Sequence, residues 1–397
     1  MKITLLTQYY KPEMGAPQNR LYEMCLGLQS LGADVSIITA MPNYPTGKVF
    51  REYSGRFSSN EIVDGLEVRR YWLYASNSKK IFPRILNMLS FSITSLCAIP
   101  YLIKRKPDFI IVESPPLLLG LTGWIMAKLS KSKFVMNISD LWPLSARELG
   151  AINGDGMAYR MLEKIEAFLY KRSKFCMGQS QEIVNYINTH GAKEVYLFRN
   201  GVDPKRFAEV ERDFSINDRP FRLTYAGLLG FAQGISDICK NINFKELNAE
   251  LHIYGAGGEQ REIEDFLTAN PNQGIVYHGK VTREEIPYVL ANSDCTLIPL
   301  VKNIFGAVPS KIYESMASGL PIMFSGEGEG KYIVESNDIG WVSDSLDYNG
   351  LKSNILVAAS SPNLLKQKSY NCKVCAKEMY NRPKQIKALY DYFESKK

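Results

Sequence analysis

Short apolar runs alternate with helix-length segments along the chain. The first series of runs is "ITLLTQ", "ADVSIITA", "DFIIVES", "KFVMNIS", "KFCMGQS" and "VYLFRN". After a polar stretch the alternation resumes with "FRLTYAG", "AELHIYGAG", "GIVYHG", "DCTLIPL" and "LPIMFS". Near-continuous hydrophobic strands separated by helices are typical of parallel sheets covered on both faces. The pattern therefore predicts an α/β protein with two doubly wound, Rossmann-like domains.

The polar interruption sets the predicted domain boundaries. Residues 201–220 contain turn residues and mixed charge with little periodicity, so we expect a linker there. An N-terminal domain then covers residues 1–200, and a C-terminal domain covers residues 221–360. Residues 361–397 have a helical pattern, and they either extend the second domain or cross back to the first. Two such domains are expected to hold their ligand in the cleft between the carboxyl ends of their sheets.

One uncharged stretch, residues 85–103, approaches the ~20 residues of a membrane span. A crossing is not expected, because the strand "DFIIVES" follows at once and belongs in the same sheet as "ITLLTQ". Asn87, Ser90 and Thr94 recur at helical spacing and form a weakly polar stripe. The stretch is either a buried crossover helix or a helix on a membrane surface, with its basic flanks on anionic lipid. We favour the second interpretation, a membrane-associating helix over residues 83–104.

Composition restricts the class of protein. The 397 residues are 45% hydrophobic and 22% charged, which is typical of globular proteins and gives enough chain for two domains. The net charge of +7 suits anionic membranes or phosphorylated substrates, but it is too diffuse to indicate nucleic acid. Seven scattered cysteines fit a reduced compartment, and "MKITLLTQYY" has the pattern of a strand and not of a signal peptide. We therefore expect a cytoplasmic protein, peripheral on the inner face of the cell membrane.

Several kinds of site are disfavoured by missing motifs. The sequence has no DxD triplet, only three histidines, and a single CxxC at residues 372–375, so no metal site is expected. It also lacks the GxGxxG fingerprint of dinucleotide sites, the P-loop and the GxSxG elbow. An oxidoreductase is therefore disfavoured.

The segment "PSKIYESMASGLP" predicts a short helix with unusual charges in its first turn. Ser310 is a candidate N-cap, and Gly319 followed by Pro321 ends the helix. Packing of this helix on a sheet explains the caps, but it gives no reason for Lys311 and Glu314 at neighbouring positions. A ligand with hydroxyls for the carboxylate and phosphates for the lysine would use both, and a nucleotide has both groups.

Other predicted strands end in small residues or a carboxylate. Gly15 and Ala16 lie where the first strand turns into a helix, a place where backbone amides can approach an anion, although helix packing alone also explains them. The segments "YAGLLGFAQG" and "YGAGGEQ" repeat that plan in the second half. Asp140, in "SDLWPLS", either positions or deprotonates a sugar hydroxyl or caps the next helix.

The order of these motifs resembles glycosyltransferase family 4. The resemblance rests on "YKPEMGAPQNR", "MPNYPTGKV", "SDLWP", "RNGVD", "YAGLLGFAQG", "VPSKIYESMASGLPI" and "GEGE", and is closest to a bacterial capsule and O-antigen branch often described as fucosamine transferases. It implies a GT-B fold and retaining, metal-independent transfer from a UDP-sugar, with no other cofactor. The expected enzyme is a hexosyl or N-acetylhexosaminyl transferase that moves an N-acetylated amino sugar. Its expected acceptor is a saccharide linked to polyprenyl diphosphate, and its expected partners include the membrane surface but no nucleic acid.

The resemblance also assigns roles to residues. Glu314 would hold the ribose hydroxyls, Lys311 would be the cation nearest the phosphates, and Asp140 would handle the acceptor hydroxyl. These three form the predicted catalytic set. The predicted substrate-binding residues come from the strand-end turns and the start of the charged helix: Gly15, Ala16, Arg199, Asn200, Gly227, Gly230, Gln233, Gly255, Gly306, Ala307, Val308 and Ser310.

Three positions depart from the family pattern. Gly306 stands in place of the second glutamate of most members, so the backbone amides of Ala307 and Val308 are expected to contact the donor sugar. Gln233 stands in place of a phosphate-binding lysine, which shifts the electrostatic load toward Lys311 and Arg199. Ser139 replaces the histidine that often precedes the aspartate of "SDLWP".

Two other functions stay open. A nucleotide-sugar epimerase could use the same architecture, but a soluble epimerase has no use for the apolar stretch at 85–103. A degenerate relative that binds nucleotide sugar without activity, or that serves as the scaffold of an assembly complex, would explain the three departures. It would not explain why Asp140, Lys311 and Glu314 are all present, so we favour the transferase.

Overall fold

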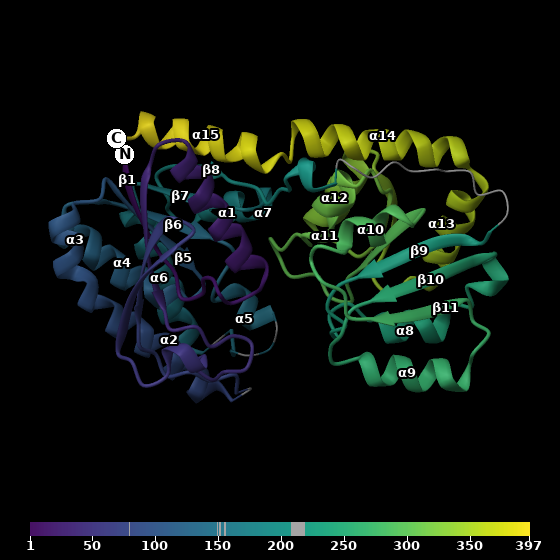
Figure 1. Ribbon diagram of the computed structural model, residues 1–397, viewed down its shortest axis with the longest axis horizontal. Coiled ribbons are helices and arrows are strands. Elements are labelled where there is room, and N and C mark those ends of the chain that lie inside the picture. The colour runs from purple at the N-terminus through teal and green to yellow at the C-terminus, as the bar shows by residue number, and fades with distance from the viewer. Residues whose placement is uncertain (79, 149, 151, 155, 208–218) are drawn as a thin grey trace. The chain divides into compact units, whose positions relative to one another are not determined.

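The computed structural model describes residues 1–397 apart from 79, 149, 151, 155 and 208–218 (Figure 1). The chain forms two compact units: Met1–Arg199 with Pro383–Lys397, and Asn200–Arg382. Each unit is a mostly parallel sheet whose strands alternate with helices, which confirms the predicted pair of doubly wound domains.

The predicted linker at 201–220 is described only at its two ends, because residues 208–218 lie outside the described residues. At its beginning, Val202 and Phe207 are buried in the core of the second unit. The backbone of Val202 also pairs with Asn381. Residues 201–207 are therefore part of the second unit.

The first unit has an eight-stranded sheet with the order β3-β4-β2-β1-β5-β6-β7-β8. Its strands are β1 (Lys2–Leu6), β2 (Asp34–Ala40), β3 (Ser58–Val63), β4 (Leu66–Tyr71), β5 (Phe109–Ser114), β6 (Lys133–Ile138), β7 (Phe175–Gly178) and β8 (Val195–Leu197). Neighbouring strands are parallel except in the β3–β4 hairpin. The strand order reverses between β1 and β5, and ligands of open α/β sheets bind at the carboxyl ends beside such a reversal.

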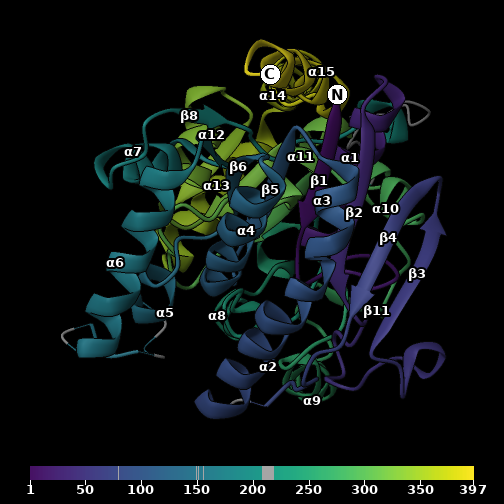
Figure 2. The same ribbon diagram turned by 90° about the vertical axis from the view of Figure 1, so that its left-hand side faces the viewer.

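Helices connect these strands. They are α1 (Ala16–Ser30), α2 (Ile81–Thr94), α3 (Ile99–Arg105), α4 (Leu117–Ser130), α5 (Leu144–Glu148), α6 (Met157–Arg172), α7 (Gln181–Thr189) and α15 (Arg382–Ser395), with 3₁₀ turns η1 (Arg51–Tyr53) and η2 (Ser95–Ala98). Within this unit α4 packs between α2–α3 and α6 on one face of the sheet (Figure 2).

The last helix is an integral part of the first unit's core. Ile386, Leu389 and Phe393 on α15 are buried among side chains of α1 and the sheet. The Phe393 ring lies 4.9 Å from that of Phe109. A Cβ added at Gly27 of α1 would lie 2.8 Å from Ile386, so α1 and α15 approach each other at a glycine. Each fully buried side chain of this size contributes about 1.5–3 kcal/mol to folding.

The second unit has a six-stranded parallel sheet with the order β11-β10-β9-β12-β13-β14. Its strands are β9 (Phe221–Ala226), β10 (Ala249–Tyr254), β11 (Ile275–Gly279), β12 (Cys295–Pro299), β13 (Ile322–Ser325) and β14 (Gly340–Ser343). Its helices are α8 (Ile235–Asn241), α9 (Gln260–Ala269), α10 (Ile286–Ala291), α11 (Lys311–Ala317), α12 (Glu329–Ser336), α13 (Tyr348–Ser360) and α14 (Pro362–Glu378), with η3 (Pro204–Phe207) and η4 (Lys245–Leu247). The order reverses between β9 and β12, so the carboxyl end of β9 is the expected ligand position.

Candidate functional site

The charged helix predicted from "PSKIYESMASGLP" is α11, and its lysine reaches the end of β9. Lys311 Nζ donates a hydrogen bond of 2.9 Å to the Tyr225 hydroxyl and lies 4.1 Å from the centre of that ring. Gly227 leaves room for the lysine, because a Cβ there would lie 2.3 Å from Lys311 Cε. Two of the predicted residues, Lys311 and Gly227, are therefore in contact at the strand-order reversal.

Burial changes the acid–base behaviour of this lysine. Desolvation lowers the pKa of Lys311 from 10.5 to about 8, and the nearby charge of Glu314 opposes that shift. Glu314 lies one turn further along α11 and is half-buried. An anion bound beside Lys311 would stabilise its charged form and raise the pKa again.

The predicted N-cap of α11 is wrong in its chemistry. Ser310 occupies the N-cap position, but its backbone is already helical and its side chain makes no capping hydrogen bond. Instead its carbonyl accepts from the amides of Tyr313 and Glu314 at 3.1 and 3.4 Å. A cap needs a non-helical backbone to turn its side chain onto the first amides, and Ser310 lacks that conformation.

The loop before α11 contains a tight turn at Gly306. Gly306 is buried and has a φ of +83°, a conformation that favours glycine. The amide of Ala307 donates to the carbonyl of Ile304 at 3.0 Å, closing a tight turn. That amide is therefore engaged within the loop, which counts against its predicted contact with the donor sugar. Val308 follows and is half-buried.

The two glycine-rich turns of the second unit pack against each other. Gly227 donates its amide to the Tyr254 carbonyl at 2.8 Å, and a Cβ at Gly255 would lie 1.8 Å from the Gly227 carbonyl oxygen. Gly230 faces the Gln233 side chain, which would lie 3.0 Å from an added Cβ. Close approach of the loops thus gives a packing reason for Gly227 and Gly255.

A buried carboxylate missed by the sequence analysis covers the start of α8. Glu259 accepts hydrogen bonds from the amides of Ile235 and Ser236 at 3.0 and 3.5 Å. Burial raises the pKa of Glu259, and the two amides oppose that change. In the sequence this residue is the glutamate of "YGAGGEQ", which lies 24 residues after Ile235, whose amide it accepts from. The carboxylate of Glu259 thus occupies the first amides of α8. Gln233 lies just before this helix end, so these two amides are already engaged by the protein itself.

In the first unit, the predicted small residues lie at the start of α1. Gly15 is the N-cap and Ala16 the first helical residue, and no side chain caps this end of the helix. Helix amides without a capping side chain are able to bind an anion. A Cβ at Gly15 would lie 2.4 Å from Gln18 Oε1, so the Gln18 side chain is close to this helix end.

Asp140 lies at the carboxyl end of β6 and is half-buried. Burial raises its pKa, and hydrogen bonds from the Ser145 side chain and the Leu141 amide oppose that shift. Its carboxylate is therefore held within the "SDLWPLS" turn. A carboxylate with a raised pKa is a better proton acceptor, so the acid–base interpretation stays a prediction for this residue.

A buried charge network next to Asp140 was not predicted. Glu113, at the end of β5, accepts a 2.6 Å hydrogen bond from Arg20 of α1 and a 2.5 Å hydrogen bond from Asn137. Ser139 hydrogen-bonds both Glu113 and Arg20. Burial raises the pKa of Glu113, and the Arg20 charge is the main opposing influence. This network fixes the strand segment that leads into Asp140, and its sequence signal was the penultimate residue of "DFIIVES", a glutamate.

Two predicted residues lie where the chain passes between the units. Arg199 ends the first segment of the first unit, and Asn200 begins the second unit.

Among the described residues, no group of three or more His, Cys, Asp or Glu side chains could hold a metal ion. Cys372 and Cys375 are buried on α14, and both thiols are free of disulfides.

The uncharged stretch forms α2, η2 and α3 and connects β4 to β5 of one sheet. One helical stretch of the described chain, Phe82–Arg105, has the length and apolar composition of a membrane span. Its polar stripe faces the protein: Asn87 donates to the Tyr74 carbonyl at 2.8 Å, and Thr94 to that of Trp72 at 2.5 Å.

The opposite side of this stretch is apolar and exposed. We call it the α2 apolar face, and it consists of Phe82, Ile85, Leu86, Leu89 and Ile93. Phe82 is 71% exposed and Ile93 64%. A water-facing helix normally places such side chains inward, so the polarity of α2 is reversed.

Comparison with known proteins decides the family. Residues 15–201 match the model of the glycosyl transferase 4-like domain, and residues 221–361 match that of glycosyl transferases group 1. The chain belongs to glycosyltransferase family 4. It is 26% identical over 337 residues to WcaI of Escherichia coli K12, named as a colanic acid biosynthesis glycosyl transferase; the match covers 80% of this chain and 82% of WcaI. It is 25% identical to the glycosyltransferase WbjE of Pseudomonas aeruginosa over 60% of this chain and 62% of WbjE.

Solved structures support the GT-B fold of this glycosyltransferase. Sucrose-phosphate synthase from Thermosynechococcus elongatus superposes with a TM-score of 0.73 at 16% identity, over 100% of both chains. The lipopolysaccharide glycosyltransferase WaaG gives 0.65 at 13% identity, over 98% of this chain and 99% of WaaG. At these identities the similarity concerns the fold, and the predicted GT-B architecture is confirmed.

Proposed function

We propose that this family 4 enzyme transfers a sugar from a UDP-sugar, with retention, to a lipid-linked saccharide during bacterial surface polysaccharide synthesis. The names of WcaI and of AmsK of Erwinia amylovora support the pathway class, since WcaI is named for colanic acid and AmsK for amylovoran. The Anabaena protein HepE, whose fold is similar with a TM-score of 0.70 at 13% identity, was solved with UDP, which supports the choice of nucleotide. An N-acetylated amino sugar is the proposed donor group.

One observation carries the donor proposal: the half-buried ammonium of Lys311 at the strand-order reversal, hydrogen-bonded to the neutral Tyr225 hydroxyl. A buried cation that faces a neutral acceptor gains energy when an anion binds beside it. We assign the diphosphate of the donor to Lys311 and its ribose hydroxyls to Glu314. Charge-assisted hydrogen bonds of this kind contribute about 1.5–3 kcal/mol each.

Stabilisation of the departing UDP is the proposed main catalytic effect. A positive charge that the protein already holds in place stabilises the developing negative charge on the phosphate. No side chain or water has to reorient during the reaction, so this stabilisation lowers the barrier. Asp140 is the proposed group for the acceptor hydroxyl, since its pKa is raised by burial and it lies at the end of β6. The amides at Gly15 and Ala16, at the start of α1, are proposed to meet an anion of the substrate.

The α2 apolar face supports a peripheral position on the membrane. Its aliphatic and aromatic side chains are proposed to enter the interface of the lipid layer, with Arg84 and the basic end of α3 near anionic headgroups. A surface-bound enzyme of this kind would meet a polyprenyl-linked acceptor directly in the membrane.

Thermal denaturation with nucleotides tests the donor site. Ligand at ~100 times its Kd adds about 2.7 kcal/mol of stability, so UDP without metal is expected to raise the Tm clearly, and GDP and NAD are not. Glu314→Gln is expected to weaken the UDP effect, while the matched Glu335→Gln on the surface of α12 leaves it unchanged. A UDP shift that survives Glu314→Gln would contradict the ribose assignment. Absence of any nucleotide effect would favour the scaffold of an assembly complex, which needs no nucleotide.

A further inference from the structure

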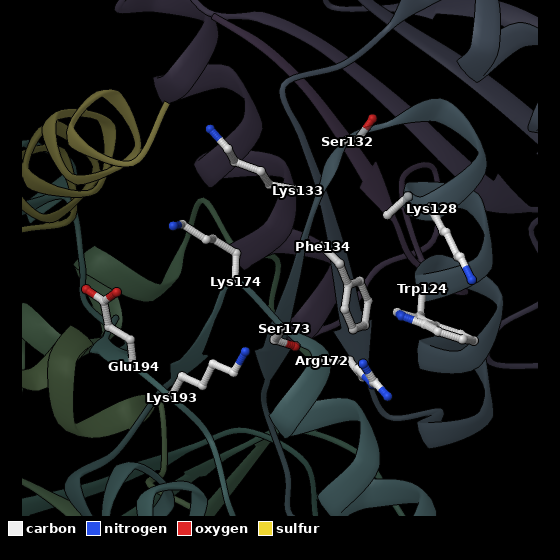
Figure 3. A pocket seen from close by; sticks show the side chains of 11 residues that line it. Trp124, Lys128, Ser132, Lys133, Phe134, Arg172, Ser173, Lys174, Lys193 and Glu194 are labelled. Atoms are coloured by element: carbon white, nitrogen blue, oxygen red, sulfur yellow. The ribbon is translucent and has the colours of Figure 1, made fainter.

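A pocket of about 540 Å³ opens in the first unit, and nearly half of its lining is cationic (Figure 3). Its walls come from the ends of α4 and α6 and from the residues that lead into β6, β7 and β8. Five cationic side chains line it: Lys128, Lys133, Arg172, Lys174 and Lys193. A single carboxylate, Glu194, lies among them, so the lining has a net charge of +4, against +7 for the whole chain.

The topology explains why these lysines converge. Lys133 is the first residue of β6, Lys174 directly precedes β7, and Lys193 lies two residues before β8. The three strands are parallel neighbours, so their first residues meet at one edge of the sheet. Asp140 follows the other end of β6, roughly 20 Å away at ~3.3 Å per residue. The pocket is therefore separate from the candidate active site of this unit.

Ordinary structural roles account for only part of this charge. Lys128 and Arg172 lie in the last turns of α4 and α6, where a cation is favourable beside the helix carbonyls. That reason does not extend to the three lysines at the strand starts. Like charges around one pocket repel each other, and although solvent screens the exposed ones, an anion bound among them would relieve that repulsion.

The pocket's own carboxylate, Glu194, offsets this charge only in part: the charge of Lys174 acts on it, but its direct partners are Lys396 and Tyr392. Glu194 accepts hydrogen bonds from Lys396 at 2.5 Å and from the Tyr392 hydroxyl at 2.6 Å, which lower its pKa. Lys133 donates to the backbone carbonyl of Lys396 at 2.9 Å. Among the ion pairs of the described residues, none joins any of the five pocket cations to a carboxylate.

We propose that this pocket binds a phosphate- or diphosphate-bearing molecule as a second anion site of the enzyme. Lys174 and Lys193 lie across the pocket from Phe134 and Trp124, so the phosphate would meet the lysines while the organic part contacts the rings (Figure 3). Arg172 adds a fork of donors suited to phosphate oxygens. The site goes beyond the proposed transfer reaction and does not depend on it.

The same chemistry is available from two sources, a soluble phosphate ester or a phospholipid headgroup. On α4 the exposed Ile125 and Leu129 directly follow the pocket residues Trp124 and Lys128. A lipid phosphate in the pocket would therefore have apolar side chains next to it for its acyl region. The experiment needs one probe for each source.

Full-length protein is titrated with sodium pyrophosphate by calorimetry, without metal and at low ionic strength. In parallel it is floated with phosphatidylcholine vesicles that contain or lack phosphatidylglycerol. The pocket variant is Lys174→Gln with Lys193→Gln, at two exposed positions where loss of folding is not expected. The control is Lys366→Gln with Lys377→Gln on α14, which removes the same charge elsewhere.

Each outcome decides the proposal. A loss of pyrophosphate affinity of about tenfold or more in the pocket variant alone supports the site with a soluble ligand. A similar loss of binding to the anionic vesicles alone, again absent from the control, supports it with a lipid headgroup. Equal behaviour of the pocket variant and the control with both probes overturns the proposal. Pyrophosphate bound at the donor site of the second unit would be retained in both variants and so does not confuse the comparison.

Discussion

Replacing Lys311 with methionine is expected to make the free enzyme more stable while weakening donor binding. Burial lowers the pKa of Lys311 from 10.5 to about 8. Between these pH values the unfolded chain holds a proton that the folded chain has lost. The stability of the free enzyme therefore rises with pH across this window, and the full penalty is present below pH 8.

The magnitude follows from the shift. A change of about 2.5 pKa units at 1.36 kcal/mol each corresponds to about 3 kcal/mol, an upper figure because the residue is half-buried and partly screened by solvent. Lys311→Met also loses the hydrogen bond to Tyr225, which costs about 1 kcal/mol. The variant should thus be stabilised by about 2 kcal/mol at pH 7, and this advantage should vanish near pH 10.

Urea denaturation of wild type and Lys311→Met at pH 7 and pH 10, without ligand, measures both quantities. Lys366→Met, on an exposed position of α14, is the control for loss of a charge and should show no pH-dependent difference from wild type. The reasoning is refuted if Lys311→Met is less stable than wild type at pH 7, or if its difference from wild type is the same at both pH values. UDP affinity of the same variant, measured separately, should fall at least tenfold.

Four further predictions concern Lys311 with its ligand and three other parts of the enzyme. UDP binding at pH 8.5 should take up about 0.7 proton as the pKa of Lys311 rises, seen as a buffer-dependent enthalpy in calorimetry; independence of the buffer would contradict phosphate contact. Asp140→Asn should leave UDP affinity unchanged and lower kcat by about 10²–10⁴-fold; unchanged turnover would exclude it as the base. Leu89→Ser with Ile93→Ser should move the protein from the membrane fraction to the soluble fraction at unchanged Tm, whereas continued flotation with lipid would count against the α2 apolar face. Arg20→Ala should destabilise the first unit by about 3–5 kcal/mol, because its carboxylate partner stays buried; a loss below about 1 kcal/mol would show that the network is solvated.

The sequence predicted the features that depend on local pattern. The two parallel sheets followed from near-continuous apolar runs, and the end of α11 followed from Gly319 and Pro321. The pairing of Lys311 with Gly227 was not foreseen as a contact, although both residues were predicted for the site. Periodicity and turn chemistry act over a few residues, so elements are accessible and contacts between distant segments are not.

The missed features all join segments that are far apart in the sequence. Glu113 is the penultimate residue of an apolar strand, and its partner Arg20 lies 93 residues earlier. The pocket lysines each looked like an ordinary polar strand start, and only the order β6-β7-β8 brings them together. The prediction of Ser310 as a capping side chain failed for a local reason. Its residue type indicated a cap, but its backbone is already helical.

Buried charges of this enzyme differ in whether the protein itself satisfies them. Glu259 has two backbone amides, and Glu113 has Arg20 together with two polar side chains, so a ligand would add little to either. Lys311 has the neutral Tyr225 hydroxyl instead, and desolvation lowers its pKa although the charge of Glu314 opposes that shift. A charge that is satisfied internally contributes to folding, whereas one that is incompletely satisfied stores free energy that a ligand can release. The stability that Lys311 costs the free enzyme is therefore the same free energy that a bound diphosphate would recover, which is why substitution at this position should move stability and affinity in opposite directions.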